Sequence, residues 1–373
     1  MEMVELYHPE LRGVIVGETE LCSLDDGLLY RGYDATELAI EASFEETVHL
    51  LCLGETLPTA EQLSDLRSLL VEAAAAPPVV TGVFDSLPLH LPVGDALRSA
   101  VSLLGHDDWE PGGASASAAQ AIRLIAQVPT LIEEWLVRRD GRKRIGPCAT
   151  RSHAGNVFAQ VVGREARPHE ERALDAMLTL TAEHELTVAT FAARVTASTG
   201  ADLYAAATAA LAALSGPEGL PSASRWVDHL PRITSREQAE AWVADELERT
   251  PRPGGFGHPV FQVSDPRAAV LEQIAETVCS LNNKNCSLEA QADAVEQAVW
   301  RATQLPPNIE WPRRRLLRYM DIDDELTLPL FLCGRIVGWC AHVIEQQAEG
   351  TTYRPRSRYR GAGPLRFVPL ERR

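Results

Sequence analysis

The sequence has few positive charges for its length. Against 52 aspartates and glutamates it carries 35 lysines and arginines, and the formal net charge of the 373 residues is −17. A chain with this excess of negative charge repels nucleic-acid backbones and anionic lipid surfaces. We therefore expect neither nucleic acid nor a membrane among its partners, although a local group of arginines can still hold a small anion.

Targeting and membrane-spanning signals are also missing from the sequence. The first ten residues, MEMVELYHPE, have neither a basic segment nor the apolar stretch of a signal peptide. The uncharged run from Leu203 to Pro217 is rich in alanine and too short to cross a bilayer. These observations predict a cytoplasmic protein.

The seven cysteines include no Cys-x-x-Cys pair. Cys279 and Cys286 are seven residues apart, as are Cys333 and Cys340, and this spacing does not suit zinc ligands. We expect buried free thiols, as is usual in a reducing compartment, and no metal site.

Nucleotide-binding motifs and a parallel-sheet pattern are absent as well. The glycines of Pro253 to His258, PGGFGH, match neither GxGxxG nor GxxxxGK[ST]. Most segments show helical periodicity instead; after a cap at Thr187, for example, apolar or small residues recur at Val188, Phe191, Ala192 and Val195. We predict an all-α protein, with one short β-hairpin in residues 11–34, where Gly17 and Asp26-Gly27 indicate turns.

What the chain does contain is a set of segments that resembles citrate synthases. The stretch EHELTVATFAARVTAST, which contains His184, is similar to a segment of that family. The Gly-Phe-Gly-His of 255–258 followed by Asp-Pro-Arg at 265–267 matches a joint signature of the same enzymes. The resemblance covers most of the chain. It implies a citrate synthase-like helical fold in two domains, a large one of residues 1–218 and 321–373 and a small one of residues 219–320.

The resemblance also implies a binding site for oxaloacetate. Its substrate-binding residues would be His184, His258, Arg267, Arg335 and Arg354. A histidine in the position of His258 can donate to the carbonyl being attacked, and arginines bind carboxylates through paired hydrogen bonds. In the family the tail arginine reaches the site of the other subunit, so the chain is expected to form a homodimer in which Arg354 crosses the interface.

The second half of the resembling site departs from the family. The catalytic base is an aspartate in citrate synthases, and here Asn308-Ile309-Glu310-Trp311 supplies Glu310, a carboxylate one methylene longer. The family histidine that stabilises the enol of the acetyl group is replaced by Gly219. His258 and Glu310 are thus the predicted catalytic residues. Loss of one preorganised donor costs on the order of 10²–10³ in rate.

Basic residues follow Glu310 directly. Arg313 and Arg314, followed by Arg315, are new relative to the family pattern and could meet the phosphates of CoA. A solvated helix start is an equally good interpretation of the same three arginines.

Two functions are compatible with the sequence. The first is an acyltransferase that condenses an acyl-CoA, either acetyl-CoA or a different donor, with oxaloacetate or a related 2-oxo acid. It would use acyl-CoA as a co-substrate and hold no permanently bound cofactor or metal. The alternative is a catalytically weakened homologue that binds the keto acid or acts as a regulatory partner. Gly219 favours the alternative, whereas Glu310 and the oxaloacetate residues favour the enzyme.

Overall fold

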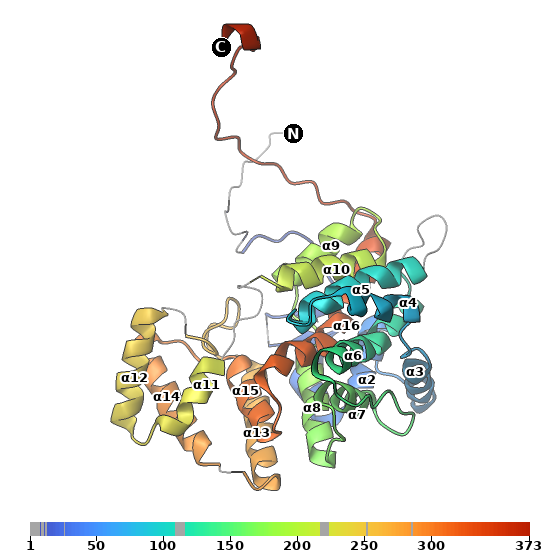
Figure 1. The fold of residues 1–373 in the computed structure, drawn as a ribbon. Coiled ribbons are helices and arrows are strands. Elements are labelled where there is room, and N and C mark those ends of the chain that lie inside the picture. The colour runs from blue at the N-terminus through green and yellow to red at the C-terminus, as the bar shows by residue number, and fades with distance from the viewer. Residues whose placement is uncertain are drawn as a thin grey trace.

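The computed structural model describes residues 8, 11, 13–25, 27–108, 116–216, 224–250, 253–284 and 286–373 (Figure 1). Within these residues the fold is almost entirely helical, as the sequence predicts. The α-helices are α1 Ala35–Glu41, α2 Phe44–Cys52, α3 Ala60–Glu72, α4 Pro78–Thr81, α5 Val93–Asp107, α6 Ala118–Asp140, α7 His153–Val157, α8 Pro168–Thr181, α9 Val188–Ala197, α10 Leu203–Leu214, α11 Ser224–His229, α12 Arg236–Arg249, α13 Pro266–Leu281, α14 Ser287–Thr303, α15 Glu310–Tyr319 and α16 Thr327–Glu349. Short 3-10 or π turns are η1 Gly82–Ser86, η2 Phe158–Val162, η3 Leu230–Arg232, η4 Asp324–Leu326 and η5 Leu370–Arg372.

Side-chain caps fix the starts of several helices. Ser43 with Glu46 forms a capping box before α2, and Thr59 with Gln62 forms one before α3. The hydroxyl of Thr187 accepts from the backbone N–H of Thr190 at the start of α9. The cap at Thr187 was predicted from the sequence.

The strands near the amino terminus form a three-stranded antiparallel sheet, not a simple hairpin. The order is β1 Cys22–Ser23, β2 Leu29–Tyr30 and β3 Tyr33–Asp34. The expected turn at Gly17 joins no strands among the described residues. A second tight turn at Arg31-Gly32, where both residues have positive φ, joins β2 to β3 instead, and this turn was missed.

The helix α16 runs through the centre of the larger core (Figure 1). It packs on α6, α8, α9 and α2. Two of its glycines allow the preceding chain to come very close: a Cβ on Gly334 would lie 2.6 Å from Oγ1 of Thr181, and one on Gly338 would lie 2.4 Å from the carbonyl oxygen of Ala182. This close approach fixes α16 against the end of α8. His184 lies three residues after that end.

A smaller apolar core lies within the predicted small domain. It is built mainly from α11, α12 and α14. The rings of Phe256 and Trp311 pack in it at a tilt, with their centroids 4.9 Å apart. Helices α13 and α15, from the same stretch of sequence, contribute Leu271 and Leu316 to the larger core. Because α15 also carries Trp311, this helix connects the two cores. The boundaries 219 and 320 remain predictions.

One helical stretch of the described residues is long and apolar enough to cross a membrane. It spans Asp324–Glu349, and 83% of its most apolar window is buried inside the protein. Its apolar character is explained by its place in the core of the fold, because neighbouring helices already cover its apolar surface.

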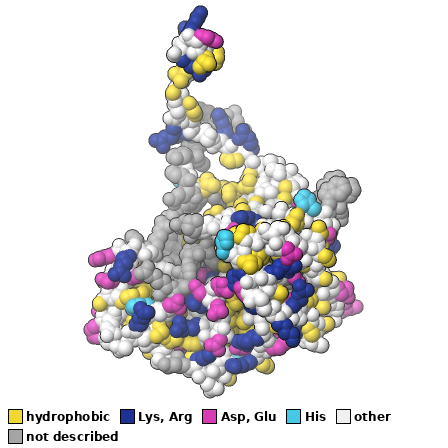
Figure 2. Space-filling model, in the orientation of Figure 1, with side chains coloured by type: hydrophobic (Ala, Val, Ile, Leu, Met, Phe, Trp, Pro, Cys, Tyr) yellow, Lys and Arg dark blue, Asp and Glu magenta, His cyan; other side chains and the backbone are white. Residues whose placement is uncertain are grey.

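The carboxy-terminal residues leave the body of the protein. Residues 351–369 form no helix or strand before the short turn η5, and nearly all of them are exposed. Figures 1 and 2 show this tail projecting away from the helices. It carries Arg354, whose guanidinium donates only to the carbonyl of its neighbour Pro355, at 2.7 Å, among the contacts of the described residues.

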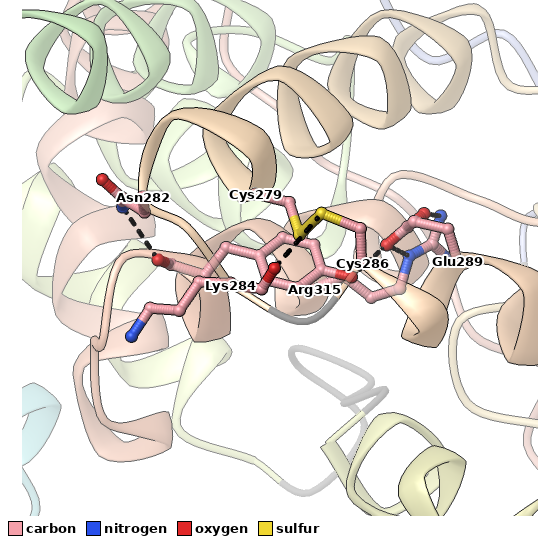
Figure 3. Close-up of a disulfide and its surroundings, with 7 residues drawn as sticks. Cys279, Asn282, Lys284, Cys286, Glu289 and Arg315 are labelled. Carbon is pink, nitrogen blue, oxygen red and sulfur yellow. Dashed lines mark hydrogen bonds and ion pairs between the residues drawn. A yellow bond between two sulfur atoms is a disulfide. The ribbon is translucent and has the colours of Figure 1, made fainter.

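The expectation that all cysteines are free thiols is wrong. Cys279, near the end of α13, is joined to Cys286, just before α14, by a disulfide (Figure 3). The short connection between the two helices places the Cα atoms of the two cysteines 5.9 Å apart, which is within the range that a disulfide can span. Cys333 and Cys340 are free and buried on α16.

Candidate active site

Two histidines meet between the two cores. His184 lies in the turn between α8 and α9, and His258 lies in the glycine-rich loop before α13. Their Nε2 atoms are 2.9 Å apart. Nδ1 of His258 accepts from the backbone N–H groups of Val260 and Phe261 at 3.1 and 3.0 Å. His258 therefore carries its hydrogen on Nε2, which donates to His184 and would be available to an incoming carbonyl.

Arg267 is fixed beside these histidines by Asp265. Asp265 caps α13 through the N–H of Arg267 and also binds its guanidinium through two hydrogen bonds of 2.9 and 2.8 Å. Both side chains are almost fully buried. Nη1 of Arg267 lies 3.5 Å from Nδ1 of His184. The pair holds a positive group at a defined place in the site.

Arg335 reaches the same corner from α16. Its Nε donates to the carbonyl oxygen of Thr181 at 2.7 Å, and its guanidinium stacks over the ring of Phe331 at 5.1 Å. The side chain is 4% exposed. Arg335 forms no salt bridge among the described residues, so its guanidinium is free to bind a carboxylate of a ligand.

Glu310 begins α15, and the loop of His258 holds that helix start in position. Asn308 donates two hydrogen bonds to this loop: its N–H donates to the carbonyl of Gly255 at 2.9 Å, and its amide Nδ2 donates to that of Gly257 at 2.8 Å. The same asparagine accepts from the N–H of Glu310 at 3.0 Å. Asp265 accepts from the N–H of Ile309 at 3.0 Å. The predicted base, Glu310, and the predicted carbonyl donor, His258, therefore lie on two segments that are hydrogen bonded to each other.

Burial and neighbouring charges set the protonation of these groups. Burial, together with the positive charge of Arg267, lowers the pKa of His258 to about 4, while Asp265 opposes the change. Burial also lowers the pKa of His184 far below its usual value, with help from Arg267 and Arg335. Both histidines are thus neutral at pH 7. Burial raises the pKa of Glu310, although Arg313 acts in the opposite direction.

The three arginines after Glu310 are buried, so the expectation of a solvated helix start is wrong. Arg313 is hydrogen bonded to Glu310 through Nη2 and is 1% exposed. Nε of Arg314 lies 3.1 Å from Oδ1 of Asp324. Arg313 therefore pairs with the predicted base, whereas Arg314 pairs with an acid that lies beyond the end of the helix. Their predicted contact with CoA stays a prediction.

Arg315 forms ion pairs with a different group of acidic residues. Glu272, Asp293 and Glu296 place one oxygen each within 4.8 Å of one another, as metal ligands can be placed. Arg315 lies among them, with Nη2 2.9 Å from Glu272 and Nη1 3.5 Å from Glu296. The guanidinium already supplies the positive charge that such a group needs.

One predicted residue is not brought into this site, and a second position lies outside the described residues. Arg354 lies in the exposed tail of the same chain, as it must if it serves a second subunit. Gly219 lies outside the residues that the structure describes, so its replacement of the family histidine remains an observation on the sequence.

Several residues that support the site were not recognised from the sequence. Asp265 was recognisable as an N-cap followed by a proline at the first helical position. Glu183 is held by the buried His342 at 2.9 Å, and the hydroxyl of Tyr30 donates to the carbonyl of Glu183 at 3.1 Å. His342 lies 159 residues from Glu183, and no local pattern indicates that contact.

The fold is all-α, and two histidines, two buried arginines and a buried carboxylate come together in it. Residues 10–356 match the family model described as citrate synthase, C-terminal domain. The chain belongs to the citrate synthase family.

Relatives match over nearly the whole length. "Citrate synthase 2" of Bacillus subtilis is 35% identical, covering 97% of this chain and 98% of the relative. A 2-methylcitrate synthase of Shewanella oneidensis is 31% identical and covers 97% of each chain. The solved structure of citrate synthase from Thermoplasma acidophilum, in ternary complex with carboxymethyl coenzyme A and oxaloacetate, matches with a TM-score of 0.88 at 25% identity, over 99% of this chain and 100% of the other.

Proposed function

We propose that this chain condenses an acyl-CoA with oxaloacetate or a closely related 2-oxo acid. The observation that carries the proposal is the meeting of His184, His258, Arg267, Arg335 and Glu310 from four separate segments in one buried cluster. Relatives named for citrate and for 2-methylcitrate synthesis support the reaction class.

In this proposal the acceptor binds first to the positive groups. Arg267 and Arg335 hold the two carboxylates of the 2-oxo acid, since both are buried and fixed by neighbouring acceptors. Nε2–H of His258 then donates to the acceptor carbonyl oxygen in place of its present partner His184. A neutral imidazole with a fixed tautomer suits this role because the donor is oriented before the substrate arrives.

The donor half of the reaction is assigned to Glu310. Its carboxylate removes a proton from the carbon next to the thioester carbonyl, and that carbon attacks the acceptor carbonyl. Burial of Glu310 raises its pKa and so makes it a stronger base than an exposed glutamate. Water then hydrolyses the thioester and releases CoA. Acyl-CoA is a co-substrate in this scheme, and no cofactor is bound permanently.

Assembly and location belong to the same proposal. A homodimer in which Arg354 crosses to the partner explains why this arginine lies in an extended tail away from its own site. The Thermoplasma acidophilum relative binds oxaloacetate and a CoA derivative, which supports the same two ligands here. We place the enzyme in the cytoplasm and leave its pathway open.

The proposal is tested by CoA release with oxaloacetate and a panel of acyl-CoAs. Acetyl-CoA and propionyl-CoA belong in the panel because 2-methylcitrate contains one carbon more than citrate. Thiol release that requires both substrates, and that Glu310→Gln abolishes, supports the enzyme. Binding of oxaloacetate without turnover on any donor would instead favour the keto-acid-binding or regulatory homologue.

A further inference from the structure

Arg313 has hydrogen-bonding groups that the fold leaves unused. Its Nη2 is bound to Glu310, whereas Nε and Nη1 are buried and have no hydrogen-bond partner among the residues that the structure describes. The side chain is 1% exposed. A buried guanidinium normally has its N–H groups occupied, because each unpaired donor costs free energy. These two donors are thus available to a ligand.

The position of Arg313 connects it to the reacting groups. It lies one turn after Glu310 on α15, and its guanidinium stacks over Phe331 at 5.4 Å. Arg335 stacks over the same ring at 5.1 Å. Phe331 therefore contacts two cationic groups. Arg335 is the one assigned to the carboxylate of the 2-oxo acid, and Arg313 is the one beside Glu310.

The chemistry of the base requires a donor at this place. When Glu310 takes the proton, the C–H bond breaks and its electron pair moves toward the thioester oxygen, which becomes negatively charged. A donor that is fixed beside the base before the reaction stabilises this charge most effectively. Among the described residues, Arg313 is the guanidinium hydrogen bonded to Glu310.

We propose that Arg313 is a catalytic residue whose free N–H groups bind the thioester carbonyl oxygen and stabilise the enolate formed there. The C–C bond then forms as the enolate electron pair attacks the acceptor carbon and the acceptor oxygen takes the hydrogen bond of His258. This inference rests on the proposed condensation. It assigns Arg313 to the reacting carbonyl and not to the phosphates of CoA.

The test compares Arg313→Gln and Arg313→Lys with Arg318→Gln as the matched control. Arg318 lies on the same helix, partly exposed, and pairs with Asp228 at 3.1 Å on the surface. Two donors are used, acetyl-CoA and acetyl-pantetheine, which lacks the nucleotide phosphates. Exchange of the acetyl methyl protons with deuterated water is followed in the presence of malate, which resembles oxaloacetate but has no ketone to attack.

We expect Arg313→Gln to slow both exchange and condensation by about 10²–10³-fold with either donor, which is the usual loss for one fixed donor of this kind. Arg313→Lys should lose less, and Arg318→Gln should match the wild type. The loss must persist on the high-pH plateau, where Glu310 is ionised in every variant, since this separates charge stabilisation from tuning of the base. Calorimetric binding of oxaloacetate shows that the variants are folded.

Two results overturn the inference alone: exchange by Arg313→Gln at the wild-type rate while the wild type condenses, or a loss confined to acetyl-CoA, which indicates a phosphate contact. A wild type that neither exchanges methyl protons nor condenses overturns the proposed function, and the assignment of Arg313 with it.

Discussion

The backbone N–H of Gly338 donates to the carbonyl oxygen of Ala182 over 3.1 Å. This bond joins the middle of α16 to the turn that carries His184, two residues after Ala182. Arg335 lies one turn earlier on α16 and donates to Thr181. The distance between the predicted carboxylate-binding arginine and the histidine pair is thus set by backbone contact.

The first prediction concerns this contact. In Gly338→Ala, the new methyl group would lie 2.4 Å from the Ala182 oxygen, so the helix and the turn must separate. We expect a loss of about 1–3 kcal/mol in the free energy of unfolding, as for other overpacked sites. Chemical denaturation measures it. Gly82→Ala is the control, because a Cβ at Gly82 meets nothing within 4 Å. Equal stability of the two variants would contradict the packing argument.

The second prediction concerns the pair behind His184. Glu183 and His342 are both fully buried, and Nδ1 of His342 accepts from Arg194 at 2.9 Å, so Nε2–H of His342 donates to Glu183. His342→Leu leaves Glu183 without this donor. Leaving a buried carboxylate without its hydrogen-bond donor costs about 1–3 kcal/mol or more.

Denaturation measures that loss, and adding Glu183→Gln to His342→Leu should recover part of it by removing the stranded charge. The matched control is Glu349→Gln, which breaks a half-exposed pair with Arg194 and should cost less than about 1 kcal/mol. If the double variant were no more stable than His342→Leu, the buried charge would not be the cause.

The third prediction concerns the state of His258. Because its pKa is lowered to about 4, its neutral form should persist across the physiological range. The stability gained from neutral His258 is present above pH 6.5 and is lost as the pH falls toward 4, since the unfolded chain then binds the extra proton. Nitrogen-15 NMR should show hydrogen on Nε2 and none on Nδ1 at pH 7. Titration near pH 6.5 would contradict this.

The fourth prediction concerns the acid limb of activity. Glu310 must be ionised to act as a base, and burial raises its pKa above the ordinary 4.5. We therefore expect kcat/KM for the acyl donor to fall as the pH is lowered through a value above 4.5. Rate measurements from pH 4.5 to 9 test this. An inflection at or below 4.5 would mean that Glu310 is not buried in the working enzyme.

The fifth prediction concerns the acceptor site. Arg267→Gln and Arg335→Gln should each weaken oxaloacetate binding by about 2–3 kcal/mol, because each removes a charged donor from a buried carboxylate. Calorimetry measures the affinity, with Arg318→Gln as the control. Unchanged affinity in both variants would remove these arginines from the site.

The sequence was most informative where chemistry and local pattern coincide. Capped helix starts such as Thr187 and the Gly-Phe-Gly-His loop of His258 are local features, so they could be interpreted residue by residue. Glu310 and Arg313 are three apart, and this spacing places side chains on one helix face. Their pairing was nevertheless overlooked, because an arginine-rich helix start is usually solvated.

Long-range features were beyond reach for a physical reason. The contact of Glu183 with His342, and that of Gly338 with Ala182, depend on how α16 packs on α8, which periodicity does not specify. The disulfide was missed because its formation depends on where α13 ends and α14 begins. Sequence patterns place such helix ends only to within a few residues.

Formation of a carbon–carbon bond is the central claim, and isotope tracing tests it most directly. Acetyl-CoA labelled with carbon-13 in its methyl group is incubated with oxaloacetate and the wild-type protein, and the products are identified by mass spectrometry and carbon NMR. We predict that the label appears in a tricarboxylic acid, and that Glu310→Gln forms none. Label recovered only as acetate, with CoA released, would show hydrolysis without condensation and would contradict the account.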